Sequence, residues 1–313
     1  MKRLIILILF LCSLTTAHAA NEHSIFLHHS TGGVIYDAGH VPDWFSTYNA
    51  AHNSSYSIAE RAYPTGSYPW DNYPYDYWNL WVNGACRADE PERHCLAQLA
   101  AEYDVVIFKN CYPVSKIQED TGSPDITSSE KKLENYKLQY SAVRDKLQQY
   151  PNILFIFWTG APLRESETDP EEAGRARQFA NWVKNDMLAG GTYPNIRVFD
   201  YFDLTADNAN VLRPEYESSD SHPNTLAAEA VGPVFAQFIV DSAQSFFDNK
   251  TICGNSIVEG GEECDDGVDN GKPCVPEEGQ TCTYCTSSCT LRKVGASTTY
   301  SFLYYILLLN GKK

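Results

Sequence analysis

Short apolar runs alternate with longer amphipathic stretches over most of the chain. Five runs rich in Val, Ile and Phe predict buried strands at residues 24–28, 56–59, 104–108, 153–158 and 196–199. Stretches with helical periodicity predict helices at residues 128–149, 171–188 and 225–247. Strands that alternate with helices indicate a parallel sheet covered on both faces. The pattern therefore predicts an α/β domain of three layers, α/β/α, with a parallel sheet of about five strands.

The two ends of the chain follow other patterns. A basic start, an apolar run over residues 4–14 and the small residues Ala17 and Ala19 predict a secretory signal peptide of residues 1–19. We assign residues 20–250 to the α/β domain, 251–292 to a Cys-rich module and 293–313 to a short apolar tail. The apolar stretch 300–309 would reach about 15 Å as a helix, half of a bilayer core, so it is a poor membrane anchor and any membrane or cell-surface association through it is expected to be weak. The alternatives are a sorting tail and a strand-like end that packs on the protein.

Charge narrows the class of partner. The net charge is −16 and the isoelectric point is near 4.8, which argues against nucleic acid or an anionic membrane as partner. A secreted chain meets an oxidising compartment, so its cysteines are disulfide candidates first.

The cysteines predict a local bridge and a small cross-linked module. Cys86 and Cys95 are expected to close a short loop, which leaves Cys111 as a buried free thiol. Six cysteines in a segment with few apolar residues predict three bridges that replace a hydrophobic core, with the pairing left open. They are Cys253, Cys264, Cys274, Cys282, Cys285 and Cys289.

Two metal alternatives apply to the same segment. Cys282 and Cys285 have a spacing found in zinc sites, although secretion and the even number favour disulfides. Asp265, Asp266 and Asp269 offer calcium ligands, but their spacing does not match an EF-hand loop and a solvated acidic turn is the preferred interpretation. The segment resembles a myxo-type Cys-rich disulfide repeat.

Candidate chemistry lies where the predicted strands end. Ser30 follows the first strand at a Gly-rich turn, and Asp220 and His222 precede the last helix. A serine, an imidazole that takes its proton and a carboxylate that orients the imidazole can form a hydrolase. Each residue also has a structural interpretation: Ser30 or Asp220 as a helix N-cap, and Asn110 as a turn former.

The order of these motifs over residues 24–239 resembles that of the SGNH (GDSL-type) hydrolase superfamily, which implies a flavodoxin-like sheet. The resemblance implies Ser30 as nucleophile, His222 as general base and Asp220 as the orienting acid. It also implies an oxyanion hole from the Ser30 N–H, Gly66 and the Asn110 amide, with each donor worth about 3 kcal/mol.

The chain departs from this family at two positions. The family usually has Asp directly before the serine, where this chain has His29. The family's acid usually stands three residues before the histidine, where this chain has Ser219. Asp220 stands two residues before His222, so the site is expected to work either as a triad with a differently bent loop or as a Ser–His dyad.

An aromatic segment, residues 63–81, is predicted to be a long ordered loop near the site. Rings flanked by polar side chains suit sugars, so four residues are candidate substrate-binding residues: Tyr68, Trp70, Tyr73 and Trp78. The alternative is that these rings pack the loop onto the domain, and we slightly prefer it.

These observations predict a secreted serine esterase that needs no cofactor or metal and hydrolyses an O-acetyl ester on a carbohydrate or glycoconjugate. A lipid ester is the second choice of substrate, as in a lysophospholipase. Metal-assisted hydrolysis through His28, His29, Asp220 and His222 is a further alternative, although neighbouring strand residues point to opposite faces. The last alternative is a non-catalytic module that binds glycans.

Overall fold

The computed structural model describes residues 22–69, 71–247, 253, 254, 256, 258, 262–277 and 279–295. The chain forms two compact units that divide between Gln244 and Ser245. The predicted signal peptide lies outside the described residues, as does the apolar tail beyond Gly295. The predicted domain limits at residues 19 and 250 therefore stay predictions.

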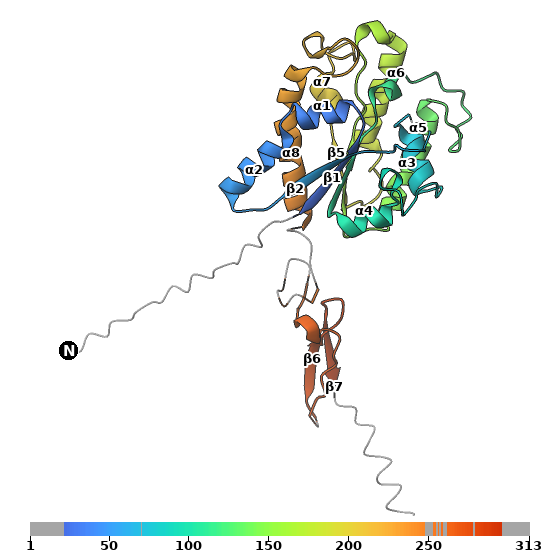
Figure 1. Ribbon diagram of the computed structural model, residues 1–313. Coiled ribbons are helices and arrows are strands. Elements are labelled where there is room, and N and C mark those ends of the chain that lie inside the picture. Colours follow the sequence, from blue (N-terminus) through green and yellow to red (C-terminus); the bar gives the residue numbers. More distant parts are fainter. Residues whose placement is uncertain are drawn as a thin grey trace, which may run out of the picture. The chain divides into compact units, whose positions relative to one another are not determined.

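A five-stranded parallel sheet forms the centre of the larger unit (Figure 1). Its strands are β1 (His23–His28), β2 (Ser57–Ala62), β3 (Val105–Phe108), β4 (Leu154–Trp158) and β5 (Ile196–Phe199). Their order is β2-β1-β3-β4-β5, and all neighbours pair in parallel. The predicted α/β fold with a parallel sheet of five strands is confirmed.

Helices cover both faces of this sheet, as Figure 1 shows. On one side lie α1 (Thr31–Asp37), α2 (Val41–His52) and α8 (Thr225–Phe247). On the other lie α3 (Pro74–Trp81), α4 (Leu96–Glu102), α5 (Leu133–Leu147) and α6 (Pro170–Asn181), while α7 (Tyr201–Thr205) follows β5. Neighbouring residues of β1 pack on opposite faces of the sheet: Phe26 packs on Phe235 of α8, and Leu27 belongs to the core beneath α3 to α6.

Helix α8 is long and apolar enough to cross a membrane by length and composition alone. However, 56% of its apolar window is buried inside the protein. Phe235 contacts Phe26 and Trp158 of the sheet. This helix is therefore part of the core of the larger unit.

Several element boundaries differ from the prediction. The helix expected from residue 128 begins at Leu133, because residues 125–130 form turns and the Asp120 carboxylate accepts the Glu134 N–H. The helix expected over 171–188 ends at Asn181 and continues as a π-helical turn, Trp182–Asp186. The segment predicted as a long loop contains α3, whose Asp76 carboxylate accepts the Tyr73 N–H at 3.3 Å.

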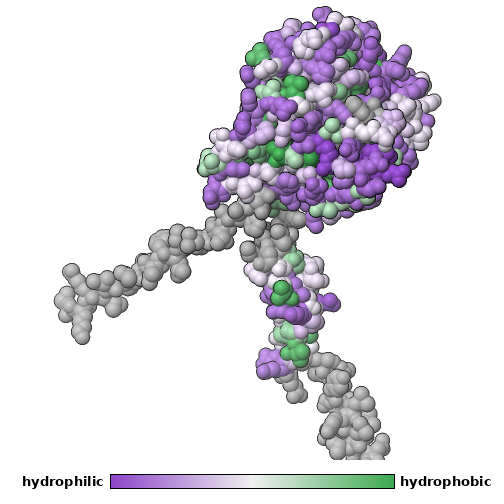
Figure 2. All heavy atoms as spheres, in the orientation of Figure 1, coloured by the Kyte–Doolittle hydropathy of each residue, from purple (hydrophilic) through white to green (hydrophobic). Residues whose placement is uncertain are grey.

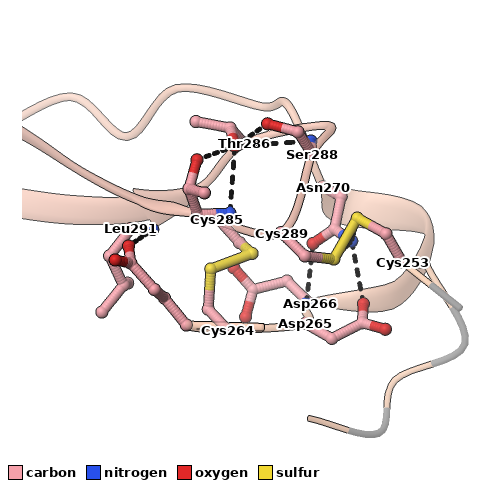
Figure 3. The surroundings of a disulfide bond; sticks show 12 residues. Cys253, Cys264, Asp265, Asp266, Asn270, Cys285, Thr286, Ser288, Cys289 and Leu291 are labelled. Atoms are coloured by element: carbon pink, nitrogen blue, oxygen red, sulfur yellow. Dashed lines mark hydrogen bonds between the residues drawn. A yellow bond between two sulfur atoms is a disulfide. The ribbon is translucent and has the colours of Figure 1, made fainter. Parts of the chain in front are cut away.

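The smaller unit is a disulfide-linked hairpin of β6 (Thr281–Cys285) and β7 (Leu291–Gly295). The predicted three bridges are present: Cys253–Cys289, Cys264–Cys285 and Cys274–Cys282. Figure 3 shows the first two side by side. Cys264, Cys285 and Cys289 are the buried cluster of this unit, so disulfides take the place of an apolar core. In the larger unit, Cys86 pairs with Cys95 and Cys111 is free and buried, as expected.

The zinc alternative for the Cys-rich module fails on geometry. Cys282 and Cys285 belong to different disulfides, so they offer no pair of thiolates to zinc. The Asp265 carboxylate accepts hydrogen bonds from Gly254 N–H and Gly267 N–H, and from the Asn270 amide, as Figure 3 shows. Asp266 and Asp269 are exposed, which agrees with the preferred interpretation of a solvated acidic turn.

The visible surface of the larger unit is mostly polar. Figure 2 shows a mostly hydrophilic face on the larger unit, interrupted by small hydrophobic areas. Leu226 and Val234 of α8 are about half exposed, at 53% and 46%. Isolated apolar residues of this kind are common on globular proteins.

Candidate active site

Ser30 occupies the turn between β1 and α1 and is exposed to solvent. Its backbone has φ 28° and ψ −82°, a combination that is sterically unfavourable for a residue with a Cβ. Ser30 stands at the N-cap position of α1 and its carbonyl accepts the Val34 N–H at 3.0 Å, but its side chain makes no capping hydrogen bond. Instead, Ser30 Oγ lies 3.0 Å from Cys111 Sγ. A strained, exposed serine at a strand end is the kind of position where active sites store strain.

Neighbouring residues hold this turn closely. A Cβ on Gly32 would stand 2.4 Å from the His28 Cβ, so only glycine fits there. The Gly32 N–H donates to the His29 carbonyl at 2.9 Å. The His29 ring donates through Nε2 to the Pro64 carbonyl at 2.6 Å. Burial lowers the pKa of His29, so this ring stays neutral and acts as a structural brace.

Asp220 and His222 form a hydrogen-bonded pair just before α8. Asp220 Oδ1 lies 2.7 Å from His222 Nδ1 and accepts the His222 backbone N–H at 2.9 Å. This is an Asx turn, in which a carboxylate bonds the backbone two residues on. The backbone N–H and then the imidazole hold the pKa of Asp220 below its usual range. The turn explains how an acid two residues before the histidine reaches the ring.

One loop contacts both halves of the candidate site. Cys111 and Tyr112 follow β3, and Cys111 contacts Ser30 while the Tyr112 ring meets the His222 ring edge-on, with centroids 4.8 Å apart. The structure therefore brings the serine and the Asp–His pair to the same edge of the sheet, where the carboxyl ends of the strands lie.

The Asn110 amide is buried close to this loop. Its side chain is 1% exposed, and neither amide atom has a hydrogen-bond partner of normal geometry in the described part of the chain. The amide lies near the Tyr140 hydroxyl and partly offsets the rise that burial causes in the pKa of that phenol. A buried amide without a hydrogen bond costs about 1–3 kcal/mol, and this one stands just after the end of β3.

Gly66 stands two residues after Pro64. It is exposed, with φ 70°, and among the described residues a Cβ built on it would meet only the Glu92 side chain within 4 Å. The preceding Thr65 N–H donates to the Glu92 carbonyl. None of the described contacts joins Gly66 to Ser30, so its place in the oxyanion hole stays a prediction.

The aromatic residues proposed for sugar binding are part of the core. Tyr68, Tyr73 and Trp78 are only 5–6% exposed and pack within the cluster around α3. Their faces are covered by other side chains, so the preferred packing interpretation describes them and the sugar-binding prediction is corrected. Trp70 lies outside the described residues.

The four residues of the metal hypothesis have separate partners. His28 Nε2 lies 2.7 Å from Glu60 Oε2, and burial lowers the pKa of His28 to about 3. His29 faces Pro64, whereas His222 faces Asp220. Among the described residues, potential ligands come together only at Cys253, Glu262 and Cys289, where the two cysteines form a disulfide.

Sequence reasoning missed three residues near Ser30. Cys111 contacts the hydroxyl itself, and Lys109 is buried behind the turn and donates to the His29 carbonyl. Asn72, fully buried with φ 55°, accepts the Cys111 N–H and so fixes that loop. The only signal in the sequence was a lysine at the end of an otherwise apolar strand.

A cavity of about 490 Å³ opens beside Tyr112. Pro113 and Leu163 supply apolar contacts to it. Its charged lining consists of two lysines and two glutamates: Lys116, Lys131, Glu167 and Glu172. Glu167 also accepts a hydrogen bond from Ser221, next to His222. The cavity is therefore adjacent to the candidate base and has a mixed polar character.

No family model matches the chain, and neither does any curated protein. Solved structures do. A putative acylhydrolase from Bacteroides fragilis is 14% identical, with a TM-score of 0.42, over 71% of this chain and 88% of the other. A GDSL-like lipase from Bacteroides thetaiotaomicron is 11% identical, with a TM-score of 0.42, over 71% of this chain and 89% of the other.

A third similar structure is a family two carbohydrate esterase from Cellvibrio japonicus. It is 10% identical, with a TM-score of 0.39, over 73% of this chain and 63% of the other. The solved structures to which this chain is similar thus include GDSL-type acylhydrolases and carbohydrate esterases.

Proposed function

We propose that the protein is a serine esterase of the SGNH type. One observation carries the proposal: the strained, exposed Ser30 and the Asp220–His222 pair lie at one edge of a parallel sheet, against consecutive residues of a single loop. These are the nucleophile, base and orienting acid that acyl transfer requires.

In the proposed reaction, Ser30 Oγ attacks the ester carbonyl and His222 Nε2 takes its proton. Asp220 holds the Nδ1–H and favours the imidazolium that forms. The tetrahedral oxyanion accepts hydrogen bonds from the Ser30 N–H and the Asn110 amide. Collapse transfers the proton from His222 to the departing alcohol. Water, deprotonated by His222, then releases the acid from the acyl-enzyme.

The Cys111 contact gives the resting position of the serine. Ser30 Oγ is paired with Cys111 Sγ at 3.0 Å, so attack requires a rotation of the Ser30 side chain away from the thiol. Hydrogen bonds of apo enzymes commonly rearrange in this way when substrate binds.

We further propose a polar ester as substrate, with an O-acetyl group on a carbohydrate or glycoconjugate as the preferred case. The cavity beside Tyr112 combines short apolar contacts with lysines and glutamates, which suits hydroxyl and amide groups better than a long acyl chain. The four disulfides and the predicted signal peptide support secretion.

The test is labelling with a fluorophosphonate probe, followed by mapping of the modified peptide and assay with p-nitrophenyl acetate. We expect the probe on Ser30 and a loss of at least about 10³-fold in kcat for Ser30→Ala. Ser54→Ala is the matched control, because Ser54 bonds only Asn49 on the surface. Aryl acetate hydrolysis by Ser30→Ala at the wild-type rate would exclude the assignment.

A further inference from the structure

Lys109 is a buried cation directly behind the candidate nucleophile. It follows β3, and its side chain is 1% exposed. Lysines are rarely buried unless they are paired with a carboxylate. None of the ion pairs in the described part of the chain involves Lys109, and its Nζ donates instead to the His29 carbonyl at 3.3 Å. Retaining a charge in this position costs stability, which points to a use for it.

The carbonyl that Lys109 contacts belongs to the peptide group that ends in the Ser30 N–H. In the proposed reaction this N–H is an oxyanion donor. A cation that donates to the oxygen of a peptide draws electron density toward that oxygen, and the N–H at the other end becomes a stronger donor. Gly32 N–H donates to the same carbonyl at 2.9 Å, so the peptide is held from two sides.

We propose that Lys109 is a positioning residue that polarises and orients the His29–Ser30 peptide, and so strengthens the Ser30 N–H toward the oxyanion. The inference rests on the proposed esterase function. Lys109 does not touch the substrate in this account. Its effect is greatest in the transition state, because the negative charge next to the Ser30 N–H develops only there.

The charge of Lys109 depends on its neighbours. Burial lowers its pKa to about 8, and the Cys111 thiol partly opposes this shift. The other titratable groups that face it are His28 and His29, whose own pKa values are lowered by burial and then by Lys109 among other neighbours. Tyr77, which donates to the Lys109 carbonyl, has its pKa raised by burial. Lys109 is therefore expected to lose its proton within the range from pH 7 to 9.5.

The experiment measures kcat and KM for p-nitrophenyl acetate from pH 6 to 9.5. We expect Lys109→Met to lower kcat by about tenfold to a hundredfold with little change in KM, which is less than loss of a direct oxyanion donor. Wild-type kcat should fall above pH 8, where Lys109 loses its proton. Lys109→Met should lack this alkaline fall, and Lys109→Arg should restore kcat and shift the fall to higher pH.

Two control variants show whether the changes in kcat and in the pH profile come from Lys109 itself. Lys146→Met removes a surface lysine that bonds Gln149 and should leave kcat unchanged. Cys111→Ser removes the thiol that contacts Ser30 Oγ, and the alkaline fall must persist in this variant. If Lys109→Met does not fold, the wild-type and Cys111→Ser profiles decide the question by themselves.

Four results would overturn the inference. The first three are an unchanged kcat in folded Lys109→Met, a wild-type profile that stays flat from pH 7 to 9.5, and an alkaline fall that disappears in Cys111→Ser. The fourth is a loss as complete as in Ser30→Ala, which would contradict a merely polarising role. The proposed function fails separately, if the wild-type protein neither hydrolyses the ester nor labels at Ser30.

Discussion

Replacing Asp220 by Asn tests how the Asp–His pair works. Asn keeps an oxygen that can accept the His222 backbone N–H, so the Asx turn should survive. The substitution removes the negative charge beside Nδ1 and allows the amide to donate to Nδ1, which places the ring proton on Nε2. A ring with its proton on Nε2 cannot accept the Ser30 proton.

The expected loss follows from the distance and the exposure of the pair. Unit charges about 4 Å apart interact by about 1 kcal/mol in water and about 4 kcal/mol at an effective dielectric constant of 20. The Asp220 side chain is 38% exposed and that of His222 29%, so solvent screens the pair and the value lies between these limits. About 2–3 kcal/mol in the transition state corresponds to about a 30- to 150-fold lower kcat.

The assay is kcat for p-nitrophenyl acetate at pH 7, with circular dichroism as the control for folding. Asp241→Asn, which removes a surface carboxylate that accepts from Gln237 on α8, is the matched variant and should keep full activity. Wild-type kcat in folded Asp220→Asn would show that the site works as a Ser–His dyad and would refute the triad. A loss of about 10⁴-fold or more would show that the amide locks the ring in the tautomer that cannot accept the Ser30 proton, an effect larger than the screened charge interaction.

Two further predictions concern the stability of the fold, through the buried residues Tyr63 and His28. Tyr63→Phe should lower the free energy of unfolding in urea titrations by about 1–3 kcal/mol, because the buried Trp81 Nε1–H, which donates to the Tyr63 hydroxyl at 2.6 Å, loses its acceptor. Tyr48 is half-buried, so Tyr48→Phe should lower the free energy of unfolding by less, and equal effects of the two substitutions would contradict this reasoning. Burial lowers the pKa of His28 from 6.5 to about 3, so the stability from its neutral form is complete above pH 6.5 and is lost as pH falls toward 3. The wild-type free energy of unfolding should therefore drop between pH 6.5 and 4.5 by up to about 2.7 kcal/mol more than that of His28→Gln, and parallel pH curves would count against it.

The local pattern of apolar residues and cysteines was enough to predict the parallel sheet and the disulfide-linked module. Strands such as β3 and β4 are buried on both faces, so they appear in the sequence as continuous apolar runs that need no knowledge of their neighbours. The three bridges of the Cys-rich module followed from number and spacing. Their pairing did not, because six cysteines allow many connectivities and only the three-dimensional path of the hairpin selects one.

The aromatic segment shows where a local pattern leaves two interpretations open. The composition of residues 63–81 suited both an exposed sugar platform and buried packing. Which one applies depends on α3 lying against α5 and on Tyr73 meeting Tyr136. A contact between residues so far apart in sequence leaves no periodic signal in either segment.

The candidate site also has features that residue order predicts and features that depend on three-dimensional contacts. Residue order alone places a serine after the first strand, and an acid and a histidine before the last helix. The three-dimensional structure was needed to show that the Asx turn brings Asp220 to the His222 ring, that Gly66 faces Glu92, and that Lys109 contacts the Ser30 turn. Chain order and strand direction fix which edge of the sheet a residue reaches, whereas loop geometry and burial fix which atoms meet there.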